Sequence, residues 1–204
     1  MTRFHRNAAV LAVTLSFAFV TTCQAGVETF EIDRAHSSIT FKIRHLLSKV
    51  PGQFREFQGK VEIDPEKRDT VNVTATVDTG SIDTDNQKRD EHLRGADFFD
   101  AGKFPKMTFQ ASKLTDVSAD HTKAKLEGTL TIRDVTKPVV LDVEWYGIAS
   151  DPWGNRKAAF AATGKVNRKD FGMIWNKTLD SGNYLLGDEV EIEVNVEAQV
   201  PKAQ

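Results

Sequence analysis

Four histidines beyond residue 25, His36, His45, His92 and His121, are the side chains that could carry acid–base or metal chemistry. None of them is spaced as His-x-His or His-Glu-x-x-His, so the sequence predicts no metal site and no cofactor. His45 shares the alternation of the apolar residues before it, and two interpretations of it stay open. It is either a neutral histidine that bonds a backbone carbonyl at a strand end, or a side chain at the mouth of a pore that contacts the headgroup of a ligand.

Two neighbouring pairs resemble parts of a catalytic site but fail on geometry. Asp90 and His92 fall on a short expected helix, where residues this close in sequence do not face each other. His36 and Ser37 are successive residues of an extended segment and point to opposite sides of it. The sequence has no Gly-x-Ser-x-Gly turn and no Gly-rich phosphate loop. We therefore predict that the protein is not an enzyme.

Arg168 stands in a chain reversal. Asn167 and Asp170 can bond the backbone there, and Gly172 can take a positive φ, a pattern that favours a structural role. A guanidinium also matches the geometry of a phosphate group, so Arg168 could instead neutralise the headgroup of a ligand. Both interpretations stay open.

The composition is that of an ordinary globular protein, with 27 Lys and Arg, 29 Asp and Glu, and 40% hydrophobic residues. This slightly acidic balance predicts no nucleic-acid partner, because affinity for phosphates comes mostly from an excess of Lys and Arg. Cys23 is the single cysteine, and its position near the start leaves the rest of the chain without a disulfide or a thiolate site.

The N-terminal segment, residues 1–25, has the pattern of a signal peptide. Arg3 and Arg6 precede an apolar run from Ala8 to Val20, and small residues lead to Ala25. That run is too short for a hydrocarbon core of about 30 Å, which needs about 20 residues, so no integral membrane segment is expected after cleavage. Cleavage after Ala25 predicts an exported single domain of residues 26–204. A lipoprotein anchored at Cys23 is the alternative.

Apolar and polar residues alternate with a period of two along most of the remaining chain, which predicts about nine strands. No long helical period separates them, so the sheet should be antiparallel, and a sheet closed on itself would leave no exposed edge. We predict an all-β fold, a single extended antiparallel barrel. The expected strands lie near 30–32, 39–45, 61–63, 71–77, 107–112, 126–132, 139–145, 160–166 and 190–200.

One short helix is expected from about Asp85 to Arg94. Thr84 stands at the expected N-cap, and Gln87 three residues later completes a capping box. Gly95 suits the C-terminal cap. A helix this short cannot form a layer of its own, so it should lie across one end of the barrel.

The inward-facing residues predicted by the alternation are of mixed size, which leaves two interpretations of the barrel interior open. Small residues could pack against large ones in a solid core, or the small residues could leave an apolar tunnel. The predicted lining is Phe41, Ile43, His45, Val73, Ala75, Val77, Leu130, Leu141, Val143, Trp145, Phe160 and Ala162.

Ten short motifs, read in order, resemble one family. The sequence resembles the YceI-like family of exported, lipocalin-like polyisoprenoid-binding proteins over essentially residues 26–200. The motifs include His36-Ser37, Ser81 to Thr84, Arg89 to Leu93, Asp97 to Phe99, Phe104-Pro105, Val135 to Pro138, Asn167-Arg168, Asp170 to Gly172 and Gly187-Asp188.

The resemblance implies a lipocalin-like barrel in the periplasm whose apolar pore holds a polyisoprenoid or the isoprenoid tail of a quinone. It implies no catalytic residue, and it implies that a homodimer can form. It favours the tunnel over the packed core, and a carrier, storage or sequestering role. The alternatives are an accessory of quinone- or isoprenoid-dependent enzymes and a ligand-free stress-protective protein.

Overall fold

The structure, a computed structural model, describes residues 26–64, 67, 71–180, 182 and 184–201. The expected signal peptide and Cys23 lie outside the described residues, so export and cleavage stay predictions. No helix within the described ranges is long and apolar enough to cross a membrane.

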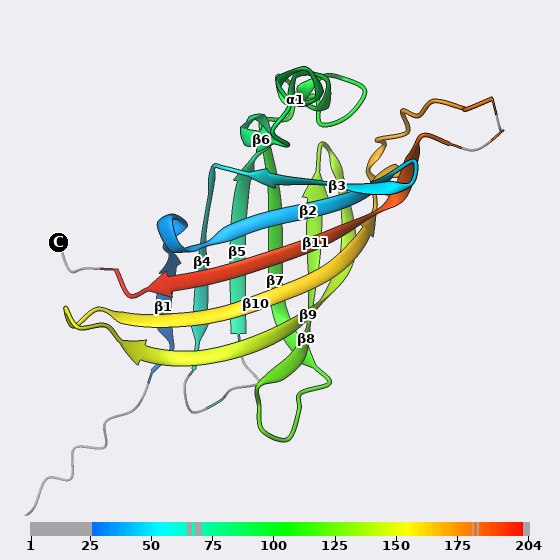
Figure 1. Cartoon of the computed structure of the whole chain (residues 1–204). Coiled ribbons are helices and arrows are strands. Elements are labelled where there is room, and N and C mark those ends of the chain that lie inside the picture. Colours follow the sequence, from blue (N-terminus) through cyan, green and yellow to red (C-terminus); the bar gives the residue numbers. More distant parts are fainter. Residues whose placement is uncertain (1–25, 65–66, 68–70, 181, 183, 202–204) are drawn as a thin grey trace, which may run out of the picture.

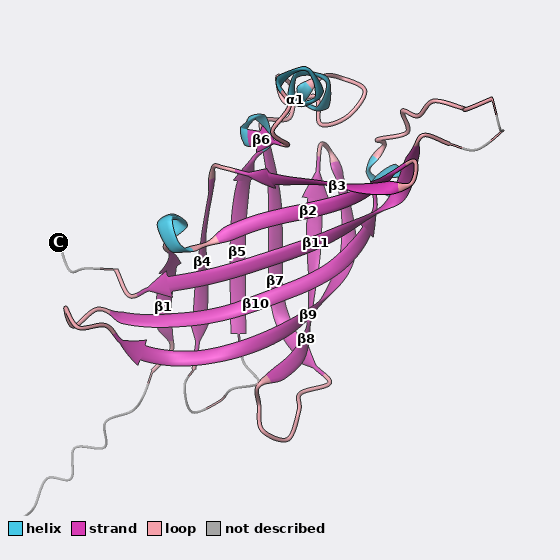
Figure 2. Cartoon of the chain, viewed as in Figure 1, coloured by secondary structure: helices cyan, strands magenta, loops and turns pink. Residues whose placement is uncertain are grey.

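Eleven antiparallel strands form one sheet in the described part of the chain, with a short α-helix at one end (Figures 1 and 2). The strands are β1 (Glu28–Ile32), β2 (Ser38–His45), β3 (Ser48–Phe54), β4 (Phe57–Ile63), β5 (Val71–Asp78), β6 (Ile82–Asp83), β7 (Lys106–Thr115), β8 (Lys123–Ile132), β9 (Val135–Ser150), β10 (Arg156–Asn167) and β11 (Leu186–Gln199). The helix is α1 (Gln87–Arg94), and three 3₁₀ turns are η1 (Arg34–His36), η2 (Thr79–Ser81) and η3 (Arg168–Phe171).

Eight strands close into a barrel in the order β1, β4, β5, β7, β8, β9, β10 and β11, and β1 pairs back to β11. β11 has two partners on this side, because residues from Leu186 to Asn195 pair with β2 and only its last residues pair with β1. In Figure 1, β4, β5 and β7 form the rear wall, and β2, β11 and β10 cross in front of them. The predicted antiparallel barrel with one short helix is confirmed.

The strand prediction missed β3 and β6. β3 contains Pro51 and Gly52, which interrupt the alternation of apolar and polar residues. Gly52 is buried against Phe41 of β2, since a Cβ built on it would lie 2.3 Å from the Phe41 ring. Position 52 must be glycine because the Phe41 ring approaches the backbone there, so β3 lacks the alternating side chains on which the prediction depended. β6 has two residues, too few for a detectable period.

The helix begins at Gln87, not at Asp85, and its N-cap is Asn86, not Thr84. The Asn86 side chain accepts a hydrogen bond from the backbone N–H of Arg89 at 3.0 Å. Thr84 is occupied elsewhere, because its backbone N–H and its hydroxyl both donate to the buried carboxylate of Asp90, at 3.0 and 2.5 Å. The predicted end at Arg94 and the cap at Gly95 are confirmed. α1 lies over one end of the barrel (Figure 2).

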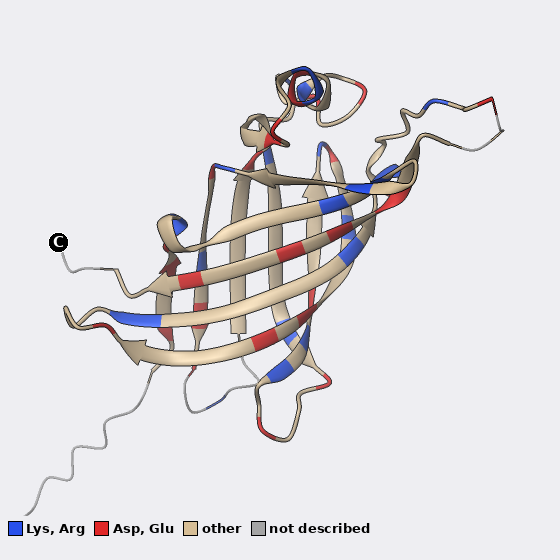
Figure 3. Cartoon of the chain, viewed as in Figure 1, with Lys and Arg blue, Asp and Glu red and all other residues tan. Residues whose placement is uncertain are grey.

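Positions of Lys and Arg and of Asp and Glu are interspersed along the strands of the barrel (Figure 3). Several of these residues form cross-strand ion pairs, such as Lys165 with Glu189 at 2.8 Å and Lys125 with Asp142 at 2.9 Å. Exposed pairs of this kind contribute only about 0–1 kcal/mol each. Stability therefore depends on the apolar inner faces, where one buried cluster lies in the barrel body around Phe30 and a second lies next to α1 around Phe54.

Gly128 on β8 marks a close approach between neighbouring strands. A Cβ at this position would lie 2.5 Å from the carbonyl oxygen of Gln110 and 2.7 Å from the Cβ of Ala111 on β7. We expect Gly128→Ala to lower the free energy of unfolding by about 1–3 kcal/mol, because the strands must shift to admit the methyl group. Urea unfolding measures the effect. Gly102→Ala is the control, since nothing lies within 4 Å of a Cβ there, and equal unfolding midpoints for the two variants would contradict the prediction.

Candidate functional site

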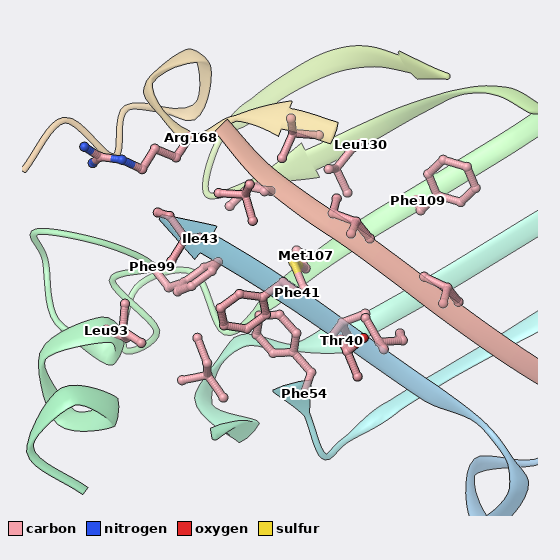
Figure 4. A pocket seen from close by; sticks show the side chains of 18 of the residues that line it. Thr40, Phe41, Ile43, Phe54, Leu93, Phe99, Met107, Phe109, Leu130 and Arg168 are labelled. Atoms are coloured by element: carbon pink, nitrogen blue, oxygen red, sulfur yellow. The ribbon is translucent and has the colours of Figure 1, made fainter. Parts of the chain in front are cut away.

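A cavity of about 440 Å³ occupies the barrel interior on the side of α1. Its walls come from all eleven described strands, and α1 with the segment after it covers one end. Figure 4 shows side chains of this lining, with Phe41, Phe54 and Phe99 in a group opposite Leu130 and Phe109. The rings of Phe41 and Phe54 lie 5.7 Å apart, and those of Phe54 and Phe99 lie 5.6 Å apart. The volume is within the range of small-molecule sites.

Ten of the twelve residues of the predicted lining border this cavity, and two do not. Val143 and Trp145 border a second cavity of about 460 Å³ at the opposite end of the barrel interior. Those on the first cavity are Phe41, Ile43, His45, Val73, Ala75, Val77, Leu130, Leu141, Phe160 and Ala162.

Val73, Leu126 and Phe160 border both cavities and so form the boundary between them. Phe160 and Val73 are buried, and they stand on the front and rear walls of the barrel respectively (Figure 1). The interior therefore contains free volume on both sides of a waist of three side chains. This arrangement differs from a solid packed core, one of the two interpretations left open by the sequence.

The strand pattern did not point to several lining residues. Leu93 and Phe99 come from α1 and the loop after it, and Met173 and Trp175 come from the segment after η3. These residues follow no period of two, and the fold brings them to the cavity from outside the barrel wall. Their aromatic or apolar character outside the strands is the only signal in the sequence that could have indicated burial.

The charged and titratable lining residues gather at the α1 end of the first cavity. They are His45, Lys88, Arg89, His92 and Arg168, and no carboxylate is among the described residues that border the cavity. Lys88, Arg89 and His92 are exposed, so this end reaches solvent. We call it the cationic end. An apolar interior that ends in cations suits an apolar chain with an anionic or polar headgroup.

The Arg89 side chain is held in place by hydrogen bonds to Thr84, which lies just before α1. Its Nε donates to the Thr84 hydroxyl at 2.7 Å, and its Nη2 donates to the Thr84 carbonyl at 2.6 Å. The side chain of Lys88, one residue earlier, makes no hydrogen bond or ion pair with any residue of the described ranges. The Lys88 ammonium is thus the cation at this end that is most available to a ligand.

Arg168 borders the cavity, but its guanidinium is 2% exposed and already bonded. Its Nε donates to the Gly187 carbonyl at 2.9 Å, and its Nη1 donates to the carbonyls of Met173 and Trp175 at 2.6 and 2.7 Å. Its Nη2 lies 3.3 Å from an Asp188 carboxylate oxygen. Burial lowers the pKa of the guanidinium, and the Asp188 carboxylate opposes this shift. These bonds fasten the segment after η3 to β11, and a headgroup contact by Arg168 stays a prediction.

An aromatic contact joins α1 to the segment after η3. The His92 ring packs edge-on against Phe98 and Trp175, with centroid distances of 5.0 and 4.9 Å. Its Nε2 lies 3.0 Å from an Asp97 carboxylate oxygen. His92 therefore lies where the two segments that cover the cationic end meet, which the sequence had not indicated.

Asp33, His36 and Glu197 bring three possible metal-ligand atoms within 4.8 Å of one another. The Lys157 ammonium lies 2.5 Å from a Glu197 oxygen and 3.9 Å from an Asp33 oxygen, so it supplies the positive charge that these carboxylates need. His36 Nδ1 lies 2.7 Å from Asp33, and this hydrogen bond is the main cause that lowers the pKa of the Asp33 carboxyl. The cluster is accounted for as an ion-pair network without a metal.

Comparison with known proteins agrees with this architecture. A YceI-like domain model matches residues 30–198. Protein YceI of Salmonella arizonae is 37% identical over 191 residues, which cover 92% of this chain and 95% of that protein. The crystal structure of a Campylobacter jejuni YCEI protein is 36% identical, with a TM-score of 0.64 over 84% of this chain and 97% of that chain.

A polyisoprenoid binding domain from Saccharophagus degradans, implicated in plant cell wall breakdown, has the same fold. Its TM-score is 0.58, and the match covers 86% of this chain and all of that one at 13% identity. The barrel, the family model and the relatives of similar length agree with the motifs read in the sequence, and the chain belongs to the YceI-like family.

Proposed function

We propose that this protein binds a long-chain polyisoprenoid, or the isoprenoid tail of a quinone, inside the barrel and acts as a carrier, storage or sequestering protein in the periplasm. The single observation that carries the proposal is the apolar cavity with its cationic end. Each buried methylene of such a chain would contribute about 0.8 kcal/mol. The relative from Saccharophagus degradans, described as polyisoprenoid binding, adds support for the ligand class.

The headgroup of the ligand would lie at the cationic end. His45 at the end of β2 and Lys88 on α1 border the cavity there, and Arg168 stands behind them with most of its N–H groups in use. A phosphate or a quinone carbonyl can accept hydrogen bonds from His45 and Lys88. The apolar chain would then extend past Phe41 and Leu130 toward the Phe160 waist.

Mass spectrometry of an organic extract of the natively purified protein tests this function. We expect an isoprenoid lipid in near-stoichiometric amount, and we expect delipidated protein to take up added polyprenyl phosphate or ubiquinone. A protein unfolded, washed and refolded without lipid is the control for carry-over. Absence of lipid in the extract together with no uptake would contradict the proposal, and fatty acids alone would show a different ligand class.

We also propose that the protein is exported and that its mature form begins at Gly26, because Ala25 follows the small-residue pattern of a cleavage site. Intact-mass measurement of protein from the periplasmic fraction should give the mass of residues 26–204. A lipid-modified Cys23 would instead show attachment to a membrane surface. Unprocessed protein that starts at Met1 and stays in the cytoplasm would contradict export.

A further inference from the structure

The turn between β2 and β3 is made of two leucines that face solvent. Leu46 is 43% exposed and Leu47 is fully exposed, at 103%. Leu46 also takes a positive φ of 52°, which is uncommon for a bulky apolar residue. A two-residue hairpin turn with a positive φ at its first central residue favours glycine there, because glycine adopts such angles at little cost. Turn geometry therefore does not favour leucine at position 46, and burial favours it at neither position 46 nor position 47.

This turn is joined to the segment that covers the cationic end of the cavity. The Leu46 backbone N–H donates to the Leu185 carbonyl at 2.9 Å, and the side chains of Leu185 and Leu186 border the cavity. Figure 1 shows the β2–β3 turn beside the chain that leads into β11, at the same end of the barrel. The turn that carries the exposed leucines is thus hydrogen-bonded to a residue of the cavity lining.

Two further exposed apolar side chains belong to the same segment. Tyr184, next to Leu185, is 59% exposed, and Ile174, next to the lining residue Trp175, is 72% exposed. We define Leu46, Leu47, Ile174 and Tyr184 as the apolar tip. Scattered exposed apolar residues are normal on a soluble protein, but four that adjoin one cavity end indicate an interaction surface.

The segment 174–184 carries one exposed cation and one exposed anion, Lys177 and Asp180, and two carboxylates next to it are paired with lysines. Asp188 is bonded by Lys169 at 2.8 Å, and Glu191 by Lys49 at 2.6 Å. The Lys169 ammonium also lies 5.6 Å from the centre of the Tyr184 ring. Tyrosine beside lysine is a pairing typical of a membrane–water interface, where the ring enters the headgroup layer and the cation meets the phosphates.

We propose that the apolar tip docks on the surface of a phospholipid bilayer and places the cationic end of the cavity against it. This inference rests on the proposed function, since a polyisoprenoid resides in a bilayer and would cross water if the cavity opened elsewhere. Leu46 and Leu47 insert into the headgroup layer, and Lys169 and Lys49 lie over the phosphates. A lipid would then pass between Leu185 and α1 without leaving an apolar environment.

Co-sedimentation with vesicles of phosphatidylethanolamine and phosphatidylglycerol tests the docking. The informative variant is Leu46→Gly with Leu47→Asn, because it removes the apolar side chains and places glycine at the positive φ of residue 46. Its thermal unfolding temperature should equal or exceed that of the parent. We expect its affinity for vesicles to fall at least tenfold. Trp153→Ser, in the β9–β10 turn, is the matched control, since Trp153 is 84% exposed but borders neither of the two cavities described, and it should bind as the parent does.

The outcomes separate docking from lipid binding. No vesicle binding by the parent, or an equal loss in Trp153→Ser, would overturn the proposal. A parent dimer that becomes monomeric in the leucine variant, measured by light scattering without vesicles, would assign the apolar tip to a second copy of the chain and overturn it as well. Lipid content is measured on the same samples. If the parent binds vesicles but contains no lipid and takes up none, the proposed function is refuted and the docking is not. If the parent retains lipid but does not bind vesicles, the docking is refuted and the proposed function is not.

Discussion

Replacing Arg168 with methionine is expected to lower the free energy of unfolding by about 3–5 kcal/mol. The guanidinium is buried and donates to the carbonyls of Gly187, Met173 and Trp175, and each acceptor left unpaired in a buried position costs about 1–3 kcal/mol. Some of these carbonyls lie on loops that can rehydrate, which holds the total to the stated range. Urea unfolding of lipid-free protein measures the loss.

Two further variants show whether the effect belongs to the guanidinium. Arg168→Lys keeps the charge but cannot make the same planar set of bonds, so it should be nearly as destabilising. Lys169→Met removes only an exposed ion pair with Asp188 and should cost about 0–1 kcal/mol. If Arg168→Met unfolded like the parent but lost a bound polyprenyl phosphate, Arg168 would be a headgroup contact and the structural account would be wrong.

Filling the first cavity from Ala162 is expected to weaken ligand binding about thirtyfold while changing stability little. Ala162 lies on β10 between Val143 and Val194 and borders the cavity, so the ring of Ala162→Phe would occupy space that a ligand chain needs. Excluding two or three methylenes at about 0.8 kcal/mol each gives a loss of about 2 kcal/mol. In a solid core the same insertion would instead cost about 1–3 kcal/mol of stability through strain.

The measurements are the thermal unfolding of delipidated protein and the amount of lipid retained after purification. Ala75→Phe on β5 should act in the same way from the rear wall, because Ala75 borders the same cavity. Ala161→Phe is the matched control, since Ala161 neighbours Ala162 on the strand and points to the opposite face. Strong destabilisation by Ala162→Phe together with a lipid-free parent would show that the barrel interior is packed.

The alternation of apolar and polar residues predicted the walls of the barrel well, because each long strand has one face that points into the barrel interior. β10 and β11 illustrate this: Phe160 pairs with Val196, and Ala162 pairs with Val194, all on the inner face. The alternation predicts which face of the sheet a side chain points to, but not how far along the barrel axis the residue lies. For this reason Val143 and Trp145 share the inward phase of Leu141 and yet border the second cavity.

The cationic end could not be predicted in the same way, because its residues come from separate segments. Arg168 meets carbonyl groups of residues 173, 175 and 187, and the sequence does not reveal which backbone acceptors will converge on a side chain. Thr84 had the residue type of an N-cap, but the buried carboxylate of Asp90 takes its donors and leaves the cap to Asn86. Local propensity yields to tertiary contacts at such positions.

The closure of the barrel through β1 and β11 also has a consequence for the order of assembly. Two residue pairs, Glu31 with Gln199 and Ile32 with Ala198, complete the ring, and they join the two ends of the barrel sequence. The same closure places β11 on β2 over seven residue pairs. Both pairings join segments that are far apart in the sequence, and the chain entropy that this costs means that the step should come late in folding. A ribosome that still holds β11 keeps the barrel open along this edge. The inner apolar faces are then shielded only after β11 has been released.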